Sequence, residues 1–178
     1  MSTSTEINRS TSTPVSLAND RFARAAVLVA RIVVAFLWIQ NVRWKVPPDF
    51  GALAAFTGFA IDHPVFPPYT AVVENIILPN IGVFGWVIVL SEATIGAFLL
   101  VGLFTRLWAL VAVVQGFVIF LTVGLTPEEW PWSYYLIMVG CLMLAGVAGG
   151  RVWGLDGLLR PVWLARDSVW AKWLARAS

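Results

Sequence analysis

Four long apolar stretches dominate this chain of 178 residues and restrict what it can fold into. They cover about residues 22–42, 81–104, 107–125 and 131–149, and Pro, Gly and polar residues separate them. A helix needs about 20 mostly apolar residues to cross the hydrocarbon core of a bilayer, which is about 30 Å thick. The sequence therefore predicts an all-α integral membrane protein, built as a bundle of four spanning helices.

The composition agrees with a membrane protein and excludes several other classes. Hydrophobic residues make up 59% of the chain and charged residues 12%, whereas soluble domains average about 45–50% and about 25%. This charge content is too low for an ordinary soluble enzyme, a disordered chain or a nucleic-acid-binding module. With one cysteine and one histidine, we expect no internal disulfide, no metal site and no haem.

The positions of the basic residues predict the orientation in the membrane. Nine of them fall on one side of the predicted spans: Arg9, Arg21, Arg24, Arg106, Arg151, Arg160, Arg166, Lys172 and Arg176. Only Arg43 and Lys45 fall on the other side. Because cytoplasmic loops are enriched in Lys and Arg, we expect a multi-pass protein of the cell membrane with both termini in the cytoplasm.

The chain divides into three predicted parts. Residues 1–21 are polar and rich in Ser and Thr, which predicts a disordered cytoplasmic tail. Residues 22–157 form the four-span domain. Residues 158–178 form an amphipathic, Trp-rich tail whose apolar residues share one arc of a helix. We expect this tail to lie on the inner leaflet, drawn to anionic lipid, or to dock a cytoplasmic partner.

The segment between the first two spans, residues 46–80, is long for a simple connection. It holds two apolar pieces, residues 51–61 and 69–78, which are split by prolines. We predict two short helices that lie in the outer interface. They either cover the bundle as a lid or form a vestibule for a substrate.

Two ionisable residues inside the spans, Arg31 and Glu92, are the first candidates for catalysis. Burying a charge in a membrane is costly unless the charge is paired. At 1.5 Å per residue, the two lie about 13 Å and about 19 Å from the same end, which predicts an Arg31–Glu92 pair. The pair either fixes the helix register or borders a quinone or proton site. Gly85 and Gly96 share a face with Glu92 and predict the close approach of another helix.

Five weaker candidates accompany this pair. Trp38 in the first span, Gln115 in the third and Tyr134 in the fourth are candidates for cofactor binding. Gln115 either makes a hydrogen bond between helices or touches the ligand. Arg43 and Lys45, at the outer end of the first span, are either ordinary interfacial residues or bind a small anionic substrate.

Three motifs stand in a characteristic order along the chain. Residues 92–107 begin with Glu92, continue through a Gly- and Leu-rich run and end in Gly-Leu-Phe-Thr-Arg-Leu. Residues 149–156 read Gly-Gly-Arg-Val-Trp-Gly-Leu-Asp, and Trp44-Lys45 follow the span that contains Arg31. Over residues 24–160, this order resembles the DoxX/DoxD family. The chain departs from the family in its longer first loop and in the Asn-Val-Arg before Trp44, where a glycine is common.

The resemblance implies a fold with four helices and a quinone-linked activity. The DoxD branch is similar to a subunit of thiosulfate:quinone oxidoreductase, which passes electrons from an external sulfur compound to membrane quinone. The resemblance implies quinone as the cofactor. The lipid bilayer is an expected partner, together with a second subunit or a soluble redox protein, or with further copies in a homo-oligomer. The alternative is a non-enzymatic membrane anchor or scaffold that recruits soluble redox partners.

Overall fold

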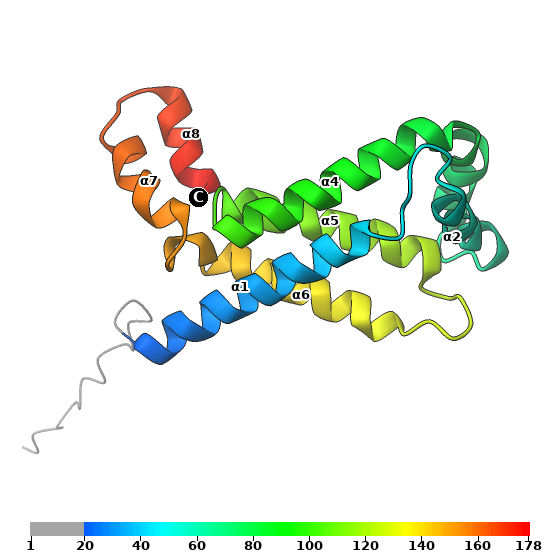
Figure 1. Cartoon of the computed structure of the whole chain (residues 1–178), viewed down its shortest axis with the longest axis horizontal. Helices are drawn as coiled ribbons and strands as arrows, with labels where there is room; N and C mark the ends of the chain where they lie inside the picture. Colours follow the sequence, from blue (N-terminus) through cyan, green and yellow to red (C-terminus); the bar gives the residue numbers. More distant parts are fainter. Residues whose placement is uncertain (1–19) are drawn as a thin grey trace, which may run out of the picture.

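The computed structural model describes residues 20–178, so almost all of the predicted disordered tail lies outside the described part. The described residues form helices and turns, and no strand. Four long helices run along the molecule: α1 (Arg21–Val42), α4 (Ile81–Val101), α5 (Thr105–Val123) and α6 (Pro131–Gly146). Figure 1 shows α2 (Gly51–Asp62) at one end of these helices, and α7 (Leu155–Leu164) and α8 (Val169–Ala177) at the other.

Within residues 20–178, three helices are long and apolar enough to cross a membrane. They are α1 with 22 residues, a continuous helix of 35 residues that ends with α4, and α5 with 19 residues. The fourth predicted span, α6, is apolar but has only 16 residues. That length spans about 24 Å at 1.5 Å per residue. The all-α fold is confirmed, whereas a fourth crossing of the bilayer stays a prediction.

The segment between α1 and α4 differs in part from the prediction. Helix α2 corresponds to the first predicted short helix. The second is not separate, because α3 (Pro67–Val72) continues through the π-helical η1 (Val73–Ile77) and the 3-10 helical η2 (Leu78–Asn80) into α4. Pro79 does not break the path, because it lies in η2, directly after the π-helical η1, where the hydrogen-bonding pattern of the helix changes.

The predicted amphipathic tail forms two helices, α7 and α8, instead of one. Helix α7 begins at Leu155, before the predicted boundary at residue 158. The side chain of Ser168 accepts a hydrogen bond from the N–H of Ala171, so it caps the start of α8 and begins a new helix. The tail also packs back onto the bundle, since the rings of Trp163 and Phe104 stack with centroids 5.3 Å apart.

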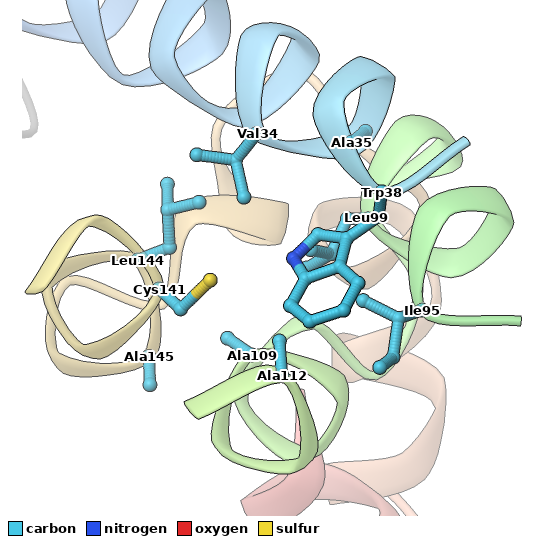
Figure 2. Close-up of a cluster of buried hydrophobic side chains, with 10 residues drawn as sticks. All are labelled: Val34, Ala35, Trp38, Ile95, Leu99, Ala109, Ala112, Cys141, Leu144 and Ala145. Carbon is cyan, nitrogen blue, oxygen red and sulfur yellow. The ribbon is translucent and has the colours of Figure 1, made fainter. Parts of the chain in front are cut away.

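The hydrophobic core lies between α1, α4, α5 and α6, with Trp38 at its centre (Figure 2). Gly96 confirms the prediction of close helix approach, since a Cβ there would lie 2.6 Å from Ile39 Cγ1 and 3.2 Å from the carbonyl oxygen of Ala35. At Gly85, the close neighbour is an aromatic ring and not another spanning helix. A Cβ on Gly85 would lie 2.5 Å from the ring of Phe50, which comes directly before α2.

Candidate functional site

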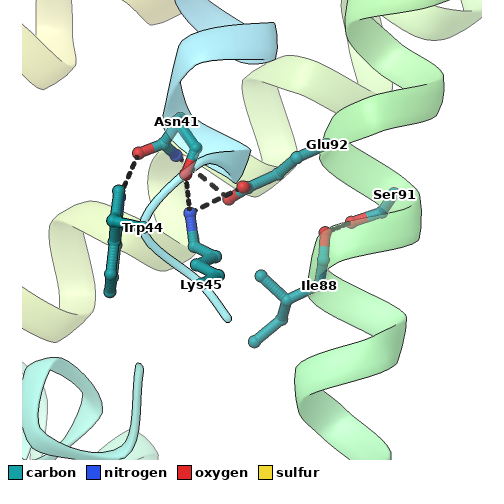
Figure 3. A network of polar contacts seen from close by, with 6 residues as sticks. All are labelled: Asn41, Trp44, Lys45, Ile88, Ser91 and Glu92. Atoms are coloured by element: carbon teal, nitrogen blue, oxygen red, sulfur yellow. Dashed lines mark hydrogen bonds and ion pairs between the residues drawn. The ribbon is translucent and has the colours of Figure 1, made fainter. Parts of the chain in front are cut away.

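Glu92 forms an ion pair with Lys45 and not with Arg31. Lys45 Nζ lies 2.6 Å from Glu92 Oε2, and the two side chains are 3% and 0% exposed (Figure 3). Asn41 Nδ2 donates a hydrogen bond of 3.1 Å to Glu92 Oε1. Both carboxylate oxygens therefore have a donor, as a buried charge requires. The predicted Arg31–Glu92 pair is wrong, and Lys45 is not an exposed interfacial residue.

The end of α1 turns back on itself and so brings Lys45 inward. The N–H of Lys45 donates to the carbonyl of Val42, and Lys45 Nζ donates to the carbonyl of Asn41 at 2.7 Å. The last carbonyls of a helix lack partners within the helix and carry the negative end of its dipole, so they favour a cation. Trp44 Nε1 donates to Asn41 Oδ1 at 3.2 Å. Burial lowers the pKa of Lys45, and the neighbouring Glu92 opposes that shift.

The ion pair borders a cavity of about 950 Å³. The cavity lies between α1, α2, α4, α5 and α6, and its lining is mainly apolar and aromatic with a few polar side chains. Such a lining and size are typical of sites for small organic ligands. Helix α2 packs against α5 and lines the cavity with Leu53, Phe56 and Thr57. The first loop therefore forms one wall of this cavity.

The structure brings five of the seven predicted site residues to this cavity. They are Trp38, Lys45, Glu92, Gln115 and Tyr134. Tyr134 Oη donates a hydrogen bond of 2.8 Å to Glu129 Oε2, on the loop that precedes α6. Arg43 is exposed and does not line the cavity. Arg31 does not line it either, because it lies towards the opposite end of the bundle.

Arg31 binds the end of α4. Its Nη1 donates to the carbonyl oxygens of Leu99 at 3.2 Å and Leu100 at 3.4 Å, and its Nη2 donates to the carbonyl of Trp153 at 3.2 Å. The two carbonyls of Leu99 and Leu100 lie in the last turn of α4, at the negative end of the helix dipole, where a cation is favoured. Peptide oxygens therefore bind both Nη atoms of the guanidinium, which makes no contact with Glu92, while its buried Nε has no partner within residues 20–178. The predicted Arg31–Glu92 pair does not form because Arg31 has these other acceptors.

Asp156 holds the start of α5, a role that the sequence did not predict. The residue is fully buried. Its carboxylate accepts hydrogen bonds from the N–H groups of Phe104 at 2.7 Å and Thr105 at 2.9 Å. Between these contacts and those of Arg31 lies Gly102, whose φ of 69° and lack of a side chain leave room for the guanidinium. In the sequence, the only signal for Asp156 is the Leu-Asp that ends the motif of residues 149–156, and the motif alone does not indicate what this aspartate does.

These observations define a class: an α-helical membrane protein in which a buried lysine–glutamate pair borders an apolar cavity. Residues 27–177 match the family model described as "TQO small subunit DoxD". The chain therefore belongs to the DoxD family, and the resemblance seen in its motifs is confirmed. No curated protein and no solved structure matches the chain. Among residues 20–178, no three His, Cys, Asp or Glu side chains are grouped to hold a metal ion.

Proposed function

We propose that the protein is a membrane subunit of a thiosulfate:quinone oxidoreductase-like complex, and that its cavity binds the head group of a membrane quinone. Family membership supports the complex, through the description of the family as a small subunit. One observation supports the location of the quinone site: the buried Lys45–Glu92 pair lines the 950 Å³ cavity. We further propose that the cavity opens towards the outer side and that all four long helices cross the bilayer.

The lining of the cavity fits a quinone head group, which is a flat apolar ring with two carbonyl acceptors. An ammonium group has three N–H donors, and Lys45 uses two of them on Glu92 and Asn41. The third N–H of Lys45 and the amide of Gln115 would hold the carbonyl oxygens, and Trp38 would pack against the ring. When bound, a quinone supplies an acceptor for two electrons and two protons.

The Lys45–Glu92 pair supplies the proton chemistry of this proposal. Lys45 Nζ holds a proton at the cavity wall, and Glu92 Oε2 lies 2.6 Å from it. That distance is short enough for a proton to pass between the two atoms. Arg31 has no place in this step, because its guanidinium is bound to peptide oxygens outside the cavity. We propose that a second subunit supplies the electrons, and that exposed Arg43 attracts the anionic sulfur compound.

A second candidate function is a membrane anchor that recruits soluble partners. The observation that favours it is the exposure of large aromatic residues on α8, where Trp170 is 79% and Trp173 is 51% exposed. Exposed aromatic side chains of this kind are typical of interfaces with lipid or protein. An anchor of this type needs no cavity ligand, so quinone binding distinguishes the two functions.

The test is thiosulfate-dependent quinone reduction in proteoliposomes that contain the protein and native membrane extract as the source of its partners. We expect Glu92→Gln to lower the rate by about 100-fold or more, the range seen when a positioned acid or base is lost. The matched control is Glu74→Gln, since Glu74 is exposed and does not line the cavity. Equal rates in the two variants, with both proteins folded, would contradict the quinone site and favour the anchor.

A further inference from the structure

Three arginines gather at the end of the bundle opposite the cavity. Arg106 lies in the first turn of α5, Arg151 ends the 3-10 helix η3 (Gly149–Arg151), and Arg160 lies in α7. All three are partly exposed. Arg151 lies beside the other two, because its neighbour Gly150 packs against Thr105, which precedes Arg106, and η3 packs against α7, which carries Arg160. Burial, followed by the like charges of Arg160 and Arg106, lowers the pKa of Arg151.

The structure gives this cluster of Arg106, Arg151 and Arg160 little compensating charge. The nearby carboxylate of Asp156 already accepts two backbone N–H groups at the start of α5. Within residues 20–178, the ion pairs are Lys45–Glu92 and Lys172–Asp167, and neither includes a member of the cluster. Asp156 is close enough to act on Arg151, and no ion pair within residues 20–178 neutralises Arg106 or Arg160.

The hydrogen bonds of the cluster are also incomplete. Arg151 Nη2 donates to the backbone oxygen of Ser178 at 2.8 Å. The Nε atoms of all three arginines are buried, and none has a hydrogen-bond partner in the described part of the chain. The side chains of Arg106 and Arg160 make no hydrogen bond within residues 20–178, so their outer Nη groups are free to bind an anion with several oxygen acceptors.

We propose that Arg106, Arg151 and Arg160 bind a phosphate group, and that this phosphate is the head group of an anionic phospholipid. Guanidinium groups match phosphate oxygens in both charge and planar geometry. The surroundings fit a lipid rather than a free ion, because α7 and α8 expose large apolar side chains beside the cluster. Leu158 is 72% and Trp170 is 79% exposed, and tryptophan favours the depth of lipid head groups.

This site is separate from the cavity and does not depend on a quinone. Arg106, Arg151 and Arg160 do not line the cavity. Arg24, whose guanidinium carbon lies 5.0 Å from the centroid of the Trp153 ring, adds a further positive charge at the same end. The lipid would fasten α7 to the start of α5, so it would stabilise the fold of the tail on the membrane surface.

The test measures lipid retention by native mass spectrometry after release from phosphatidylcholine nanodiscs with or without phosphatidylglycerol. Arg160→Gln and Arg106→Gln are the informative variants, because neither side chain makes a hydrogen bond in the described structure that the substitution would break. We expect each to weaken phosphatidylglycerol binding about tenfold, the effect of losing a charged hydrogen bond. The matched control Arg166→Gln removes an exposed charge outside the cluster and should change binding less than about twofold.

Melting temperatures that match the wild type in neutral detergent without phosphatidylglycerol show that the variants are folded and make the comparison valid. Equal retention of phosphatidylglycerol and phosphatidylcholine by the wild-type protein would overturn the proposal, as would equal losses in Arg160→Gln and Arg166→Gln. A titration with inorganic phosphate in neutral detergent identifies the source of the phosphate. Saturable binding of inorganic phosphate that Arg160→Gln abolishes, without any lipid preference, would support the phosphate site and overturn the lipid as its occupant.

Discussion

The two ends of the bundle bury charge in different ways. At the cavity end, Lys45 and Glu92 neutralise each other and line an open space. At the opposite end, Arg31 and Asp156 bind peptide groups on either side of the turn between α4 and α5. A pair that borders a cavity can exchange a proton or accept a ligand. Charges bound to helix ends cannot do so unless the turn opens, so the contacts of a buried charge indicate its role better than its depth does.

The largest expected effect is on stability at the turn. Asp156→Ala should lower the free energy of unfolding by about 3–5 kcal/mol, because it leaves two buried N–H groups without an acceptor and removes the carboxylate near Arg31. Denaturation in mixed micelles measures this loss. In the control Asp167→Ala, the lost carboxylate is fully exposed, so the change should stay below about 1 kcal/mol. Equal effects of the two substitutions would contradict the role of Asp156 in holding the turn at this end of the bundle.

A smaller loss of stability is expected at the cavity end. Glu92→Gln should cost about 1.5–3 kcal/mol, the range for hydrogen bonds to charged groups. The double variant Lys45→Met/Glu92→Leu should regain much of this lost stability, because no unpaired charge remains.

By contrast, the effects of Arg31→Gln and Glu92→Gln on the free energy of unfolding should be additive, within about 0.5 kcal/mol, since the two residues share no partner. A strong coupling between Arg31 and Glu92 in the free energy of unfolding would support the pair predicted from the sequence and contradict the structure.

Gly102→Ala tests the turn without altering a charge. The left-handed conformation of Gly102 costs a residue with a Cβ about 1–2 kcal/mol, and the new methyl group would also collide with the Arg31 guanidinium. The control is Gly146→Ala at the end of α6, where a Cβ would meet nothing within 4 Å. It should leave stability unchanged or raise it by up to about 1 kcal/mol. Similar effects at both glycines would show that the turn is loosely packed.

The proposed orientation assigns the two ends to opposite sides of the membrane. A cysteine at Asp62, which is exposed at the end of α2, should react with a membrane-impermeant maleimide added to intact cells. A cysteine at Asp167, between α7 and α8, should react only after the cells are opened. The native Cys141 is buried and gives a low background. The reverse pattern of labelling would place the cavity on the cytoplasmic side.

The sequence predicts the elements of this fold better than it predicts their contacts. Long apolar runs identify α1, α4 and α5, because a chain in lipid must satisfy its peptide groups within a helix. Counting the depth of Arg31 and Glu92 along ideal helices failed, because it ignores the peptide oxygens at the end of α4 and at Trp153 that bind Arg31. The sequence places Lys45 at the outer interface, either as an ordinary interfacial residue or as a ligand of a small anion, because it follows the end of α1. The turn at residues 43–44 carries it inward instead. The path of a chain through such a turn depends on tertiary contacts.

The central claim is that the cavity, and not the opposite end, holds the quinone. The most direct measurement is photolabelling of the purified protein in nanodiscs with an azido-quinone, followed by peptide mapping. We expect the label on peptides from α2 and α5 that line the cavity, and we expect excess quinone or Lys45→Met to prevent it. A label at the turn around Gly102, or one on the cavity that Lys45→Met leaves unchanged, would contradict the account.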